Sequence, residues 1–98
     1  MFIFNLTYIQ PIEKVESFLP EHIRYLEEHY QTNQFICSGR KVPRTGGIII
    51  CNCVSREEAE KIVQEDPFYR EKIAQYDIVE FIPSKASAIF KKIVDVGE

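Results

Sequence analysis

The spacing of the apolar residues changes along this sequence between a strand-like and a helical period, and the order of these changes is compatible with few folds. Residues 1–9, MFIFNLTYI, alternate their side chains with a period of two, which is typical of a strand, and Gln10 and Pro11 end the run. Residues 13–31 instead repeat apolar side chains at helical spacing. Pro20 lies inside that stretch, so we expect a break or kink there, with the main helix beginning near it.

Two runs near the middle of the chain predict a hairpin. Residues 34–39, QFICSG, and residues 46–54, GGIIICNCV, are strand-like and are joined by a connection rich in glycine and proline. Cys51 and Cys53 are two residues apart, hence on one face of the second run. With Cys37 they make an odd number without a C-x-x-C pair, so we interpret them as packing residues and expect neither a disulfide framework nor a metal site.

A second helix and a last strand complete the pattern. Ser55 followed by Glu58 is a capping-box signature that begins a helix extending to about Gln64. Residues 76–83, YDIVEFIP, predict the fourth strand. The resulting order, βαββαβ, is that of the ferredoxin-like α+β fold, an antiparallel sheet with both helices on one face.

The uncovered face of this predicted sheet is unusually apolar for a monomer. On the last strand Val79 and Phe81 lie on one side while Ile78 and Ile82 lie on the other, and Ile3 adds to the outer face. Such a surface predicts sheet-to-sheet pairing in a homodimer. In the alternative, the tail from residue 84 to residue 94 folds back over it, and tail and partner can also share this face.

Size and charge narrow the classes of function. The 98 residues make one domain, residues 1–83, followed by a tail, residues 84–98, in which a short helix could pack on the domain or on a partner chain. The net charge of −3 argues against nucleic acid as a partner. The basic cluster at positions 40, 41 and 44 is small, but it could hold one small anion. We find no membrane-length apolar run and no signal peptide, and therefore expect a cytoplasmic protein.

Two histidines and one aspartate are the main candidates for chemistry. His22 and His29 both lie at the edge of the apolar stripe of the first helix, and a helical projection does not separate them. For either one, a histidine without a function is the more common case. Asp66 has a structural interpretation as well, because Asp at the N-cap followed by Pro67 is a favoured start for a short turn over residues 68–72. Common catalytic motifs such as G-x-S-x-G, H-E-x-x-H or a P-loop are missing from the sequence.

Six fragments of the sequence, taken in order, resemble the YCII-related (YciI-like) family. They are LTY, EHIRYLEEHY, FICSG, PRTGGIII, SREEAEKIVQEDPF and YDIVEFIPSK, and together they cover nearly the whole chain. The family is similar in fold to the dimeric α/β barrel proteins, ferredoxin-like domains whose sheets pair into a barrel. The resemblance therefore implies the same fold and the same homodimer as the apolar sheet face.

The resemblance also implies a site. The family pattern has a histidine on the first helix and an aspartate before Pro-Phe, which match His22 and Asp66, whereas His29 does not fall on the family position. It implies a pocket at the end of the second strand and in the loop after it, lined by Ser38, Gly39, Arg44, Thr45 and Gly46.

The pair of His22 and Asp66 suggests acid–base chemistry on a small molecule. A carboxylate fixes the tautomer of an imidazole and increases its basicity, so the other ring nitrogen can transfer a proton. Arg44 and the backbone at Gly46 and Gly47 would hold an anionic or phenolic substrate oxygen, and Tyr8 and Phe68 would add aromatic contacts.

Two functions follow from this arrangement. With no activated serine or cysteine beside the histidine, we expect a lyase or isomerase that needs no metal or cofactor. The YCII-like family includes a domain resembling chlorohydroxyhydroquinone dehydrochlorinase, and its wider fold group includes muconolactone isomerase. In the alternative, the chain is a non-catalytic domain for small-ligand binding or for dimeric assembly, and the acidic cap is purely structural.

Overall fold

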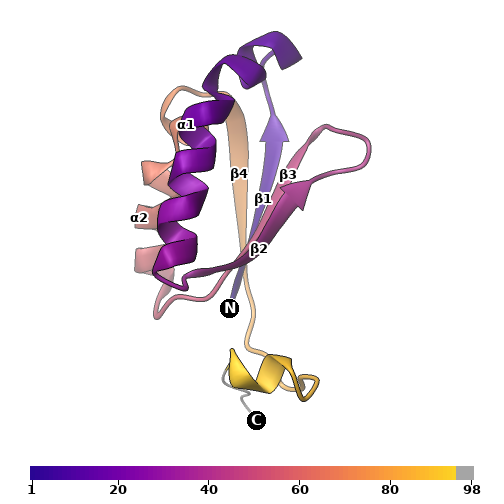
Figure 1. Ribbon diagram of the computed structural model, residues 1–98, viewed down its shortest axis with the longest axis vertical. Coiled ribbons are helices and arrows are strands. Elements are labelled where there is room, and N and C mark those ends of the chain that lie inside the picture. Colours follow the sequence, from indigo (N-terminus) through magenta and orange to yellow (C-terminus); the bar gives the residue numbers. More distant parts are fainter. Residues whose placement is uncertain (95–98) are drawn as a thin grey trace.

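The computed structural model describes residues 1–94 as a single antiparallel sheet covered by helices on one face (Figure 1). The strands lie in the order β2-β3-β1-β4. The elements are β1 (Phe2–Tyr8), α1 (Ile12–Gln31), β2 (Phe35–Arg40), β3 (Gly46–Cys51), α2 (Arg56–Glu65), α3 (Pro67–Arg70), β4 (Ala74–Glu80) and the 3-10 helix η1 (Phe90–Lys92). This order and topology confirm the predicted ferredoxin-like α+β fold.

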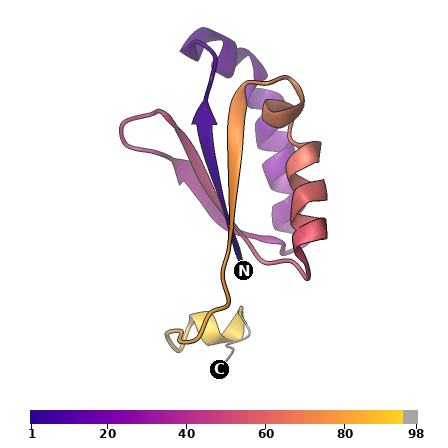
Figure 2. The same ribbon diagram turned by 180° about the vertical axis from the view of Figure 1, so that it is seen from behind.

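The central strand β1 carries the core. Its alternate side chains Phe2, Phe4 and Leu6 are buried beneath the helices, as the period of two predicts. In register, Phe4 lies opposite Ile49 of β3 and Ile78 of β4, so one layer of apolar side chains runs across the sheet. α1 and α2 bury this layer from the same side, and Figure 2 shows from behind that the other face of the sheet carries no helix.

Of the break or kink predicted at Pro20, the break and the helix start near Pro20 are wrong, because α1 is continuous from Ile12 to Gln31 with Pro20 inside it. Figure 1 instead shows a bend, since the N-terminal turns of α1 run in another direction from the rest of the helix. A proline inside a helix removes one backbone hydrogen bond and crowds the preceding turn, which bends the axis. The helix continues because the turns beyond Pro20 are held by buried side chains such as Tyr25.

The helix and strand ends follow from local hydrogen bonds. The Ser55 hydroxyl accepts the backbone N–H of Glu58 at 3.2 Å, which confirms the predicted cap of α2. β4 ends at Glu80, three residues before the expected end at Pro83. Its length is set by β1, because Glu80 pairs with Phe2, the first residue of that strand.

The tail leaves the sheet after β4 and does not cover the length of its outer face, although Phe90 and Val94 line a pocket together with Ile36 of β2 and Ile50 of β3. It continues past the end of the sheet to η1 (Figures 1 and 2), where Asn52 Nδ2 donates a hydrogen bond to the carbonyl oxygen of Ile93 at 3.2 Å. Val79, in the outer face of β4, therefore remains 46% exposed. The last four residues of the expected tail, 95–98, lie outside the described residues.

Candidate active site

A cavity of about 410 Å³ lies between α1 and the sheet. Its volume falls in the range usual for small-molecule sites. Its wall includes every residue predicted for the site except Thr45, Gly46 and Asp66. The lining residues are Leu6, Tyr8, Leu19, His22, Ile23, Leu26, Ser38, Gly39, Arg40, Arg44, Gly47, Ile48, Ile49 and Phe68.

His22 is held against Asp66 by one of its two ring nitrogens. Nδ1 of His22 lies 2.8 Å from Oδ1 of Asp66. Because an ionised carboxylate only accepts hydrogen bonds, Nδ1 carries the proton, and in the neutral ring Nε2 has a free lone pair. Nε2 forms no hydrogen bond to any group within residues 1–94, and His22 lines the cavity. The arrangement leaves the basic nitrogen available to a molecule in the cavity.

Asp66 both caps a helix and holds the histidine. Its Oδ1 also accepts the backbone N–H of Phe68 at 2.9 Å, at the first turn of α3, as the Asp-Pro pair predicts. Its Oδ2 accepts the hydroxyl of Tyr76 from β4. The side chain is fully buried, so it lies behind His22 and does not line the cavity. The two carboxylate oxygens of Asp66 therefore accept hydrogen bonds from three partners: Oδ1 from Phe68 and His22, and Oδ2 from Tyr76.

Stacking fixes the plane of the imidazole. The His22 ring lies parallel to the ring of Phe68, with centroids 4.0 Å apart and planes 3° apart. Phe68 in turn contacts Tyr8 edge-on at 6.1 Å between centroids. The ring can therefore turn little about its hydrogen bond, and Nε2 keeps its direction.

The other predicted residues contribute unequally. The Ser38 hydroxyl is hydrogen-bonded to the hydroxyl of Tyr30 at 2.6 Å, which joins β2 to α1. Arg44 lines the cavity but forms an ion pair with Glu16 at 3.3 Å. The structure does not bring Gly46 to the cavity: it is packed against the backbone of β1, and Gly47 takes its place in the wall.

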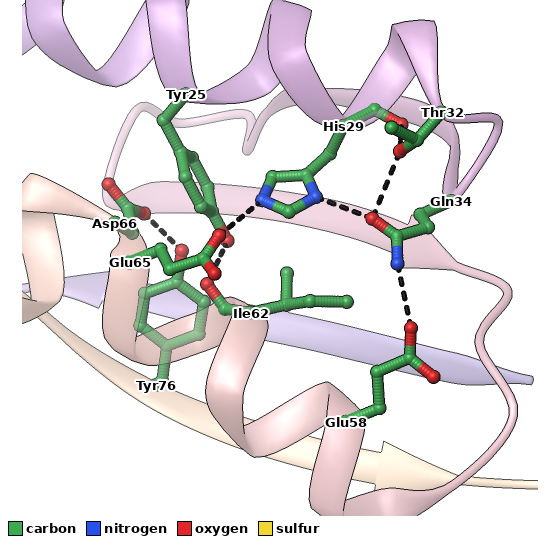
Figure 3. Close-up of polar contacts among 9 residues, drawn as sticks. All are labelled: Tyr25, His29, Thr32, Gln34, Glu58, Ile62, Glu65, Asp66 and Tyr76. Atoms are coloured by element: carbon green, nitrogen blue, oxygen red, sulfur yellow. Dashed lines mark hydrogen bonds and ion pairs between the residues drawn. The ribbon is translucent and has the colours of Figure 1, made fainter.

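His29 does not line the cavity. Figure 3 shows it between Gln34 and Glu65. Its Nδ1 lies 2.7 Å from Oε1 of Gln34, and its Nε2 lies 2.8 Å from Oε1 of Glu65. Gln34 Nε2 donates to Glu58 at 2.8 Å, which orients the amide with its oxygen toward the histidine. Both nitrogens of His29 are thus engaged within the protein, so this histidine joins α1 to α2 and to the start of β2.

Sequence reasoning missed Tyr76, and it named Arg40 only as part of a basic cluster without assigning it to the cavity. Tyr76 bonds Asp66 from β4 (Figure 3), and Arg40 lines the cavity from the end of β2. The spacing along β4 could have indicated Tyr76, because residues two apart share a face and Ala74, Tyr76 and Ile78 all lie on the face that the helices cover. Arg40 follows Ser38 by two residues, which would have placed both on one face of their strand.

Alkaline pH is expected to destabilise the fold through Tyr25 and Tyr76. Burial raises the pKa of both phenols above the ordinary value of 10.0, and the charge of Asp66 raises it further. Since the folded state holds these protons more tightly than the unfolded state, the stabilisation is fully present below about pH 10 and is lost as the pH rises. Urea unfolding between about pH 8 and pH 11 should show a slope approaching about 1.4 kcal/mol per pH unit for each tyrosine. Tyr76→Phe should reduce the slope, and an unchanged slope would contradict this assignment.

Within residues 1–94, no group of three or more His, Cys, Asp and Glu side chains is placed to hold a metal ion. No helix in the same range is long and apolar enough to cross a membrane.

The fold and the site together define a small ferredoxin-like domain with a histidine–aspartate pair at a cavity. The model of the YCII-related domain matches residues 1–82, so the chain belongs to the YCII-related family. No curated protein has a significant match to the sequence.

Among solved structures, the chain is similar to a 5-chloro-2-hydroxyhydroquinone dehydrochlorinase from Burkholderia phenoliruptrix in complex with 2,5-dihydroxybenzoquinone. The TM-score is 0.70 with 17% sequence identity, over 85% of this chain and 95% of that one. Identity this low shows a common fold and does not transfer a reaction.

Proposed function

We propose that this protein is a small-molecule lyase or isomerase of the dehydrochlorinase type, with His22 as its general base or acid. The observation that carries the proposal is that the imidazole of His22 lines the cavity, with Nδ1 bonded to buried Asp66 and Nε2 without a hydrogen bond within residues 1–94. Asp66 is a positioning residue, because it holds the proton on Nδ1 and stabilises the imidazolium that forms during proton transfer.

In a dehydrochlorination, Nε2 takes a proton from a carbon or hydroxyl group of the substrate. The electron pair of that bond forms a new C=C or C=O double bond, and the C–Cl bond breaks with its electron pair to release chloride. Chloride leaves as an ion and the imidazolium of His22 then gives its proton to water, so the net loss is that of HCl and no oxidant or reductant is required. An isomerase uses the same base and returns the proton to another carbon atom.

The shape of the site supports a small, partly apolar substrate. Leucine and isoleucine side chains form much of the cavity wall, and Phe68 and Tyr8 add aromatic surface beside His22. The chain shares its fold with a dehydrochlorinase, so elimination of chloride is the first reaction to test, and a screen of small molecules identifies the substrate.

A screen of chlorinated hydroquinones, chlorophenols and lactones is expected to find turnover that depends on His22. His22→Asn should lower kcat/KM by about 10²–10⁴-fold, because it removes the proton-transferring group. Asp66→Asn should lower kcat/KM less, since the imidazole of His22 is still present and only the carboxylate that fixes its tautomer is lost. Chloride release or ultraviolet absorbance measures the rate, and Arg56→Gln, on the surface of α2, serves as a control. Activity that survives His22→Asn would contradict the proposal.

Nitrogen NMR tests the pair without a substrate. The ¹⁵N shifts of neutral His22 should report a protonated Nδ1 and an unprotonated Nε2 in the wild type, and a mixture of tautomers in Asp66→Asn. The same tautomer in both proteins would show that the carboxylate does not orient the ring.

We further propose that the outer face of the sheet pairs with a second copy of the chain. Ile3 and Val79 lie opposite each other on this face, and beside them the Oδ1 atom of Asn5 is buried with no hydrogen-bond partner among residues 1–94. A second sheet would cover the apolar side chains and could donate to Asn5. If the protein forms this dimer and binds a small ligand but catalyses no reaction, it is the non-catalytic binding or assembly domain described above as the alternative.

Light scattering after gel filtration should give twice the mass of the chain, and Val79→Glu should reduce it to the monomer mass. Val54→Glu is the matched control, since Val54 is an exposed valine before α2. A wild-type monomer at about 100 μM, far above the dissociation constants of stable dimers, would contradict the pairing.

A further inference from the structure

The three basic side chains at the end of β2 and in the loop after it, at positions 40, 41 and 44, have different surroundings in the fold. Arg44 pairs with Glu16, and Lys41 Nζ lies 3.4 Å from the hydroxyl of Thr7. Arg40 lines the cavity and has no hydrogen bond or ion pair from its side chain to any group within residues 1–94. The hydroxyl of Thr7 does not offset the charge of Lys41, but Lys41 does not line the cavity, so Arg40 is the cation of the three that is left for a ligand there.

The strand geometry places Arg40 on the cavity side of β2. Ser38 faces α1, since its hydroxyl bonds that of Tyr30, and side chains two residues apart on a strand share a face. In register, Arg40 lies opposite Gly47 of β3, which has no side chain to fill the space beside it. The guanidinium therefore has room next to the wall that Gly47 and Ile49 form.

The charge of the cavity wall is positive although the chain as a whole carries −3. Its ionisable lining residues are Arg40, Arg44, His22 and Tyr8, and among residues 1–94 no Asp or Glu lines it. Asp66 is fully buried behind His22, and Glu16 offsets the charge of Arg44. A cavity with an uncompensated arginine and otherwise mostly apolar walls attracts an organic anion.

We propose that Arg40 anchors the carboxylate group of a small, largely apolar ligand whose body lies along Leu19, Ile23 and Phe68. The planar guanidinium binds a carboxylate with two parallel hydrogen bonds, which also sets the direction of the ligand. The proposal deepens the proposed function by naming the class of substrate, and it moves the anion contact expected at Arg44 to Arg40. It concerns binding, so it does not require that the reaction be a dehydrochlorination.

The test compares carboxylates with matched neutral amides. Benzoate, salicylate and trans-cinnamate are titrated into the full chain against benzamide, salicylamide and cinnamamide, with amide NMR shifts at constant ionic strength as the readout. We expect at least one carboxylate to bind about ten-fold or more tightly than its amide. Arg40→Gln should remove this preference. Arg40→Lys should keep part of it, because lysine has the positive charge but cannot form the two parallel hydrogen bonds of a guanidinium.

Arg44→Gln is the matched control and should keep most of the preference, since Glu16 already holds that guanidinium. The NMR spectrum of each variant confirms that it is folded. Equal affinity for acids and amides in the wild type, no binding of any carboxylate up to 10 mM, or an equal loss in Arg44→Gln and Arg40→Gln would overturn the proposal.

The His22→Asn variant separates this inference from the proposed function. It should still prefer carboxylates, because Arg40 is intact. If it also retains turnover of a substrate, the proposed role of His22 is contradicted, while the proposed role of Arg40 is supported. If Arg40→Gln binds carboxylates as the wild type does while His22→Asn is inactive, the reverse holds.

Discussion

Replacing Asp66 by alanine is expected to lower the free energy of unfolding by about 3–5 kcal/mol. The carboxylate is fully buried and accepts from three donors, the backbone of Phe68, Nδ1 of His22 and the hydroxyl of Tyr76. Alanine leaves all three donors without an acceptor in a region closed to water, and each buried unpaired donor is unfavourable. Urea or guanidinium unfolding, followed by circular dichroism, measures the loss.

A second N-cap in the same chain provides the control. Ser55 caps α2 from an exposed position with one backbone hydrogen bond, so Ser55→Ala should lower the stability by only about 1 kcal/mol. The difference between the two variants isolates the bonds to His22 and Tyr76 from simple capping. If Asp66→Ala were no more harmful than Ser55→Ala, the three-donor arrangement would contribute little to the fold.

Gly46→Ala is expected to lower the stability by about 3 kcal/mol or more, or to prevent folding. A Cβ atom at this position would lie 1.8 Å from the carbonyl oxygen and 2.7 Å from the carbonyl carbon of Leu6. Both atoms belong to the backbone of the central strand, which cannot move aside as a side chain can. The requirement for glycine here comes from close packing of β3 on β1, and Thr7 pairs with Gly46 in that register.

Gly39→Ala is the matched control, because no atom lies within 4 Å of the Cβ that it would add. Its effect should stay within about 1 kcal/mol, measured by the same denaturant unfolding. Equal effects of the two substitutions would show that β3 can move away from β1 at little cost, contrary to the register described above.

The two histidines show where sequence reasoning stopped. Helical spacing gives the angle of a side chain around the axis of α1, and by that measure His22 and His29 are equivalent. It does not say which distant segment each one meets. Only the packing of α3 against α1 brings Asp66 to His22, while the end of α2 brings Glu65 to His29. The family resemblance favoured His22, and the geometry gives a physical difference between the two.

The basic cluster illustrates the same limit at the level of charge. Arg40 and Arg44, four positions apart in one basic cluster, look interchangeable in the sequence, and only the family resemblance favoured Arg44 as the contact for an anion. Because side chains alternate between the two faces of β2, Arg40 lies on the cavity side. Arg44 lies in the loop after β2, where it pairs with Glu16 of α1. A count of charges therefore located the basic segment but not the side chain left unpaired.

The sequence by itself determined the order of the elements, the buried face of β1 and the caps at Ser55 and Asp66. These depend on neighbours within a few residues, whose spacing and hydrogen bonds act along the chain. The tertiary structure decided the continuity of α1 through Pro20, the end of β4 and the meeting of His22, Asp66 and Tyr76. Those features depend on which segments pack together, and that choice is made by burial and register over the whole fold.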